Sequence, residues 1–148
     1  MSSRSLSCSF PLVAALCLGA GFVSLALSAC GADGRYVMIG SAKAPSASGI
    51  VEVDDIGGDS SQVAVHLEFL HPPGKIDPTL TRYLVWFVPP VGSAVRAGAL
   101  SYDPVARTGD LTQTAPFHHF TVKVTAERDE RPALPGNVVI ATQDVRID

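Results

Sequence analysis

Hydrophobic and polar residues alternate along several segments after residue 50, and this two-residue period is typical of half-buried β-strands. One face of residues 62–70 is apolar, and the same alternation recurs in residues 117–126. Residues 80–88 are apolar on both faces, which indicates a strand that is covered on both sides and lies centrally in its sheet. Further short strands are expected at 50–54, 94–102, 109–113 and 138–147.

Turn-forming residues separate these segments at intervals of roughly ten residues, which is the spacing of an all-β fold. Pro72-Pro73 and Pro89-Pro90 each end a strand, because proline cannot donate a ladder hydrogen bond. No segment after residue 30 has a sustained helical period. The sequence therefore predicts an all-β domain at residues 50–148, an antiparallel immunoglobulin-like β-sandwich of seven or eight strands without the immunoglobulin cysteine pair.

The first thirty residues have a different pattern. Residues 1–9 are mostly polar and carry one positive charge, Arg4, and residues 10–27 are almost wholly apolar, as in a secretory signal. Such an apolar segment also approaches the length of a membrane-spanning helix, which needs about 20 residues. Both interpretations are open from hydropathy alone.

The next four residues, Leu27-Ser28-Ala29-Cys30, resemble the lipobox of bacterial lipoproteins, an apolar residue and two small ones before a required cysteine. The small residues let the backbone enter a peptidase groove, and the thiol is the nucleophile that takes the lipid. The resemblance implies a signal peptide at residues 1–29 that is cut between Ala29 and Cys30. It also implies acyl chains such as palmitate on Cys30, which would bind the membrane almost permanently. The alternative is a chance cysteine after a spanning helix.

The cysteine positions agree with this interpretation. Cys8 and Cys17 lie inside the expected signal, so cleavage would leave Cys30 alone and no disulfide. Gly31 follows the lipobox. In well-studied Gram-negative lipoproteins an aspartate at that position favours the inner membrane, so the resemblance implies the outer membrane here.

Small residues dominate between the lipobox and residue 50, and residues 30–49 are expected to be the lipidated cysteine and a flexible tether. An apolar island, residues 36–39, interrupts them. It is predicted to be a short strand docked on the domain, because an exposed island would promote aggregation. Contact of the island with lipid is the alternative.

The second half of the domain contains four notable segments within the span 83–140: Tyr83–Phe87, Ala97–Leu100, Gly109–Leu111 and Phe120–Glu127. Together these segments resemble the extracytoplasmic domain of the anti-sigma-K factor family. The resemblance implies a β-sandwich. That family captures its sigma factor with a cytoplasmic helical domain, whereas nine residues precede the apolar segment here, so no sigma factor is expected as a partner.

Composition excludes further classes. Charged residues are 17% and hydrophobic residues 47% of the 148 residues, which excludes a chain too poor in apolar side chains to fold. The formal net charge is -3 and no basic stripe is present, so nucleic acid is not an expected partner.

Histidines are the strongest candidates for chemistry in the domain. His66 and Glu68 share one face of a predicted strand, and His71 lies just beyond its end. His118 and His119 are neighbours and would point to opposite faces of a strand. A metal site would need three ligands, such as His66, Glu68 and either His118 or His119. The simpler interpretation is a solvent-facing polar row without metal.

No G-x-S-x-G nucleophile motif is present, and we expect neither catalysis nor a cofactor. The sequence predicts a bacterial cell-envelope protein held to a membrane by lipid on Cys30. Its β-sandwich would bind an unidentified envelope protein or ligand, or act structurally. The alternative is a periplasmic metal-binding protein or enzyme that uses His66, Glu68 and His118 or His119.

Overall fold

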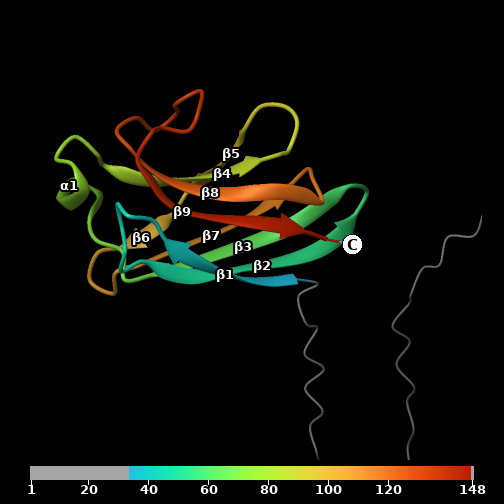
Figure 1. The fold of residues 1–148 in the computed structure, drawn as a ribbon, viewed down its shortest axis with the longest axis horizontal. Helices are drawn as coiled ribbons and strands as arrows, with labels where there is room; N and C mark the ends of the chain where they lie inside the picture. Colours follow the sequence, from blue (N-terminus) through green and yellow to red (C-terminus); the bar gives the residue numbers. More distant parts are fainter. Residues whose placement is uncertain (1–33, 148) are drawn as a thin grey trace, which may run out of the picture. The chain divides into compact units, whose positions relative to one another are not determined.

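The computed structural model describes residues 34–147, which form nine β-strands and one short helix (Figure 1). The strands are β1 (Gly34–Gly40), β2 (Ser48–Gly57), β3 (Ser60–Glu68), β4 (Arg82–Val88), β5 (Val95–Ala99), β6 (Ser101–Asp103), β7 (Thr108–Ala115), β8 (His119–Glu127) and β9 (Val139–Arg146); the helix is α1 (Pro73–Ile76).

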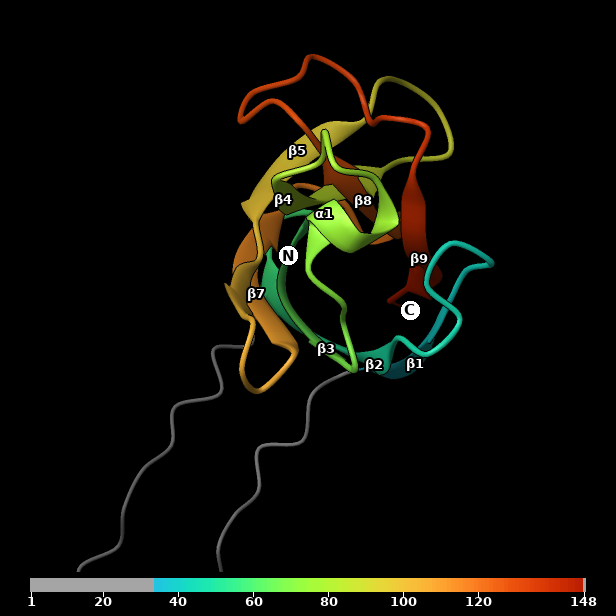
Figure 2. The same ribbon diagram turned by 90° about the vertical axis from the view of Figure 1, so that its left-hand side faces the viewer.

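All nine strands belong to one antiparallel sheet, in the order β5-β4-β8-β9-β1-β2-β3-β7-β6. The two strands that end this order, β5 and β6, are separated in the chain by Leu100 alone. The amide of Leu100 donates to the carbonyl of Tyr83 on β4 at 3.0 Å, whereas the next residue, Ser101, pairs with Asp110 on β7. The sheet therefore curls round until its ends nearly meet (Figure 2).

The predicted all-β antiparallel class is confirmed, but the sandwich of seven or eight strands is not. The physical reason is β1, which the sequence analysis had assigned to the tether. β1 pairs with β2 along its length and with β9 at Ile39 and Gly40. It joins two groups of four strands, β5-β4-β8-β9 and β2-β3-β7-β6, that would otherwise be separate layers.

The folded domain therefore begins well before the expected boundary at residue 50. The apolar island is part of the docked strand β1, and Met38 within it is fully buried. The turn that follows also packs on the domain, because Ala44 and Ala47 are buried. A Cβ on Gly40 would lie 2.0 Å from the carbonyl oxygen of Ala44, so small residues here allow close backbone packing rather than flexibility. Residues 30–33 of the expected tether lie outside the described part of the chain.

Apolar side chains fill the space inside the curved sheet. Tyr83, Val85 and Phe87 of β4 belong to this core, and the ring of Phe87 meets that of Phe120 edge-on with centroids 5.3 Å apart. The opposite face of β4 is buried too, at Leu84 and Trp86. The prediction that this strand is covered on both sides is confirmed.

The curved sheet is open at two opposite ends, where its strands begin and finish. β1 starts opposite Val53 on β2, close to the β2–β3 turn, and we call this the Gly34 end. β1 runs to Gly40, and helix α1 lies at that second end of the domain, across the opening of the curved sheet (Figures 1 and 2). We call it the α1 end.

Candidate functional site

The predicted lipidation site precedes the part of the chain that the structure describes. Ala29, Cys30 and the apolar segment 10–27 all lie outside residues 34–147. Within residues 34–147, no helix is long and apolar enough to span a lipid bilayer.

His66 lies in a cluster of charged groups on the outer face of the sheet. β3 alternates as predicted, with Val63, Val65 and Leu67 buried and His66 on the other face. The Nδ1 atom of His66 lies 2.5 Å from Oδ1 of Asp110, which is its direct partner on β7. These contacts follow from strand register, because directly paired residues on one face of a sheet meet side by side.

The same cluster makes His66 a stronger base. Its Nε2 atom lies 3.7 Å from Oε1 of Glu68, two residues along β3. The hydrogen bond with Asp110 raises the pKa of His66 above its ordinary value, and Glu68 raises it further. His66 therefore stays protonated to a higher pH than a free imidazole does.

A hollow of about 390 Å³ lies beside this cluster, over β1, β2 and β3. The side chains of Val37, Ile50, His66 and Glu68 contribute to its lining. The hollow thus places apolar Val37 and Ile50 next to the pair formed by His66 and Glu68. Among the described residues, no group of three or more His, Cys, Asp or Glu side chains is arranged to hold a metal ion.

The structure brings His66 and Glu68 together but places the other two candidate ligands elsewhere. Nε2 of His118 lies 3.6 Å from Oδ1 of Asp55, and Nε2 of His119 lies 3.4 Å from the Arg146 guanidinium. The residue before His118 accepts a hydrogen bond from Ser61, which is five residues from His66 on β3. Five strand residues span about 16 Å. The four proposed ligands therefore do not converge.

Asp110 is the charged neighbour of His66 that the sequence analysis did not single out. Its polar position within residues 109–113 was visible, but the two residues are 44 positions apart, and only the pairing of β3 with β7 brings them together.

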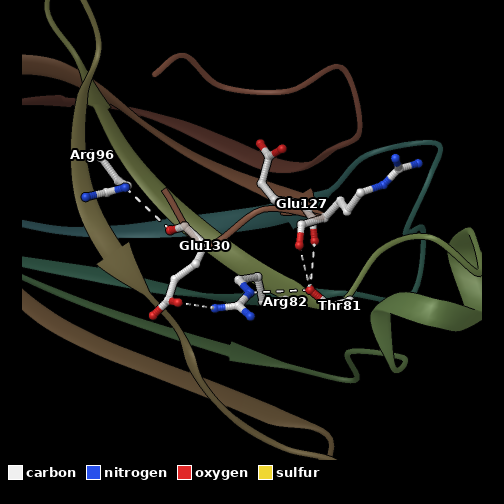
Figure 3. Close-up of polar contacts among 6 residues, drawn as sticks. Thr81, Arg82, Arg96, Glu127 and Glu130 are labelled. Atoms are coloured by element: carbon white, nitrogen blue, oxygen red, sulfur yellow. Dashed lines mark hydrogen bonds and ion pairs between the residues drawn. The ribbon is translucent and has the colours of Figure 1, made fainter. Parts of the chain in front are cut away.

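A second cluster of polar residues connects the segment after β8 to β4 and β5 (Figure 3). The carboxylate of Glu130 lies 3.7 Å from Nη1 of Arg82, and its backbone carbonyl accepts a hydrogen bond of 3.4 Å from Arg96. The Thr81 hydroxyl donates to the carbonyl of Arg128 at 2.9 Å. The charged segment 128–131 is thus held to the sheet through Arg128 and Glu130.

Beneath this segment lies a buried chain of hydrogen bonds. The Trp86 indole donates to the Thr125 hydroxyl at 2.9 Å, and that hydroxyl donates to Oε1 of Glu127 at 2.6 Å. The amide of Gly136 donates to the same oxygen at 2.6 Å. Each buried polar group has a partner, so this arrangement holds the 128–138 segment over Trp86 rather than offering a binding site. Trp86 is 1% exposed and is a packing residue.

The chain was compared with models of protein families, with curated proteins and with solved structures, and none of them matches it. The likeness to bacterial lipoproteins and to the anti-sigma-K family therefore stays a prediction from its own residues.

Proposed function

We propose that this is a lipid-anchored protein of the bacterial cell envelope, whose all-β domain is a non-catalytic binding or structural module. The observation that carries the proposal is the sequence Leu27-Ser28-Ala29-Cys30 at the end of a signal-like segment. The start of the folded domain at Gly34, a short distance after this motif, supports it.

The short connection has a consequence for the anchored protein. Four residue steps separate Cys30 from Gly34, and they span at most about 14 Å. With acyl chains on Cys30, the Gly34 end is held close to the bilayer surface and the α1 end remains free. Gly31, in place of an aspartate, favours the outer membrane over the inner one.

The arrangement of side chains favours a module without catalysis over the alternative. A metal centre or enzyme built on His66, Glu68 and either His118 or His119 needs all three groups to meet. His66 and Glu68 do meet, whereas His118 contacts Asp55 and His119 contacts Arg146. The most closely connected polar groups, at Trp86, Thr125 and Glu127, hold the fold together.

The anchor is tested by labelling the full chain in a bacterial host with an alkyne analogue of palmitate. Wild type should be labelled, and its intact mass should correspond to an acylated chain that begins at residue 30. Cys30→Ala should lose both label and cleavage. Cys17→Ala, which removes a thiol from the same segment, should be processed like wild type.

Two outcomes would contradict the proposal. One is a wild-type protein of unmodified mass that still begins at Met1. The other is undiminished labelling of Cys30→Ala. If the segment were instead a spanning helix, wild type would carry no palmitate label. Cys30→Ala would then still resist alkaline extraction from membranes.

A further inference from the structure

A hollow with a distinct chemical character lies at the α1 end of the domain. It measures about 600 Å³, within the range of about 300–1,000 Å³ that small-molecule sites occupy. Its lining residues come from the β1–β2 turn, from the segment just before α1 and from the last two residues of α1: Ala42, Lys43, His71, Pro72, Lys75 and Ile76. The lining thus combines two lysines and a histidine with three apolar residues, and it contains no acidic residue.

The two lysines have no carboxylate partner among residues 34–147. Neither Lys43 nor Lys75 takes part in any of the ion pairs between these residues. The nearest acid in sequence, Asp77, is held by the backbone amide and the hydroxyl of Thr79, each at 2.8 Å. Two ammonium groups that lack carboxylate partners beside one hollow form a local positive field.

One wall of the hollow is held in place by side chains from other elements. Arg107 donates to the carbonyls of Phe69 and Leu70 at 3.0 and 3.2 Å, and the Tyr102 hydroxyl donates to Leu70 at 3.3 Å. The Tyr83 hydroxyl donates to the carbonyl of His71. These bonds keep the segment in one conformation, although Phe69 has a φ of 57°, which a bulky residue rarely adopts.

The same contacts set the role of His71. Nη2 of Arg107 lies 3.4 Å from Nε2 of His71. Because a guanidinium only donates hydrogen bonds, Nε2 of His71 is the acceptor in this contact, which connects the ring to Arg107 just before β7 and helps to fix its position at the hollow.

We propose that this hollow binds a small anionic ligand, with a carboxylate or phosphate group held by Lys43 and Lys75 and an apolar part lying on Pro72 and Ile76. The anion supplies the partner that the two lysines lack within the domain. Charge-assisted hydrogen bonds of this kind are stronger than hydrogen bonds between neutral groups. The inference deepens the proposed function by giving its binding module a ligand class, and its biological role rests on that function. With the Gly34 end at the membrane, the hollow is on the free side of the domain.

The experiment uses the full chain in nonionic detergent, titrated with hexyl phosphate and with hexanoate while backbone amides are followed by NMR. Saturable shifts are expected at residues 42–43 and 71–76. Hexylammonium, with the same alkyl chain and opposite charge, should cause none. The tighter of the two anions shows whether the natural group is a phosphate or a carboxylate.

Charge variants separate this site from general attraction. Lys43→Gln/Lys75→Gln should weaken anion binding by about tenfold or more, because each charge-assisted contact contributes that much. The matched control Lys123→Gln/Arg131→Gln removes the same charge outside the hollow and should leave the affinity within about twofold. Lys43→Arg/Lys75→Arg should restore binding.

Binding equal for hexylammonium and the anions would overturn the proposal, and so would equal weakening by both double variants or absence of saturable shifts in wild type. The titration is repeated on Cys30→Ala, which lacks the acyl anchor. Retained binding with lost labelling separates the pocket from the anchor, so the two proposals fail or hold independently.

Discussion

The backbone amide of Gly136 donates a 2.6 Å hydrogen bond to the carboxylate of Glu127, which is 8% exposed. This contact connects a loop residue to a strand residue nine positions away and closes the cover over Trp86. It requires glycine at position 136, because a Cβ there would lie 2.5 Å from Oε2 of Glu127.

Gly136→Ala is therefore expected to destabilise the domain. The added methyl group would push the carboxylate from its donors and leave buried polar groups unpaired, at a cost of about 2 kcal/mol in the free energy of unfolding. Urea denaturation measures the change. Gly74→Ala is the control, since its Cβ would meet only the carbonyl oxygen of Leu80 at 3.8 Å, and its effect should stay within about 1 kcal/mol. Equal effects of the two substitutions would show that the Glu127 contact has no special role.

The docking of β1 is tested by two neighbouring residues on opposite faces of that strand. Met38 is fully buried, whereas Val37 is 67% exposed. Met38→Ala should lower the free energy of unfolding by about 2–5 kcal/mol because it leaves a cavity in the core. Val37→Ala should change it by no more than about 0.5 kcal/mol. A stability of Met38→Ala equal to that of wild type would mean that residues 34–40 behave as a tether after all.

Closure of the sheet depends on Leu100, which is 6% exposed and lies between β5 and β6. Leu100→Ala should cost about 2–4 kcal/mol of unfolding free energy, since its side chain packs where the two ends of the sheet approach each other. Leu134→Ala makes the same chemical change at a 64% exposed position and should cost at most about 0.5 kcal/mol. Both values come from denaturant titration. Similar costs for the two leucines would argue against a closing role.

The contact of His66 with Asp110 makes stability depend on pH. The folded-state pKa of His66 is raised, first by the hydrogen bond to Asp110. The contact therefore stabilises the fold fully below the unfolded pKa of about 6.5, and this contribution is lost as pH rises through the higher folded value. Between about pH 5 and 9, wild type should lose stability relative to Asp110→Asn as the pH increases.

NMR titration of the His66 ring provides the direct measurement. In Asp110→Asn its pKa should move back toward the ordinary value. Asp59→Asn removes a carboxylate from the β2–β3 turn, where asparagine tolerates the φ of 57°, and should leave the His66 titration unchanged. An unchanged His66 pKa in Asp110→Asn would remove the assigned cause.

The strands and their buried faces could be predicted from the chain because they depend on local alternation. Residues 62–70 show this best, since β3 buries Val63, Val65 and Leu67 as the two-residue period predicts. Phe69, which the same period placed on the buried face, lies beyond the end of β3 and is 54% exposed, because a φ of 57° turns the chain out of the strand there. Both faces of β4 are apolar in sequence and buried in the fold for the same reason. The island at 36–39 likewise indicated a strand, but its short apolar run could not show that β1 joins two halves of one sheet.

Tertiary structure alone decided which strands pair and which side chains meet. The hydrogen bonds of β1 to β9 join residues about a hundred positions apart. At Leu100, between β5 and β6, the chain changes its pairing partner from β4 to β7, which no local pattern indicates. The same holds for the sites: Asp110 meets His66 through the register of β3 and β7, and Lys43 and Lys75 share a hollow because a turn and a helix meet at one end of the sheet. The alternation of apolar and polar residues indicates which face of a strand is buried. Which strands pair with each other depends instead on the packing of segments that are distant in the chain.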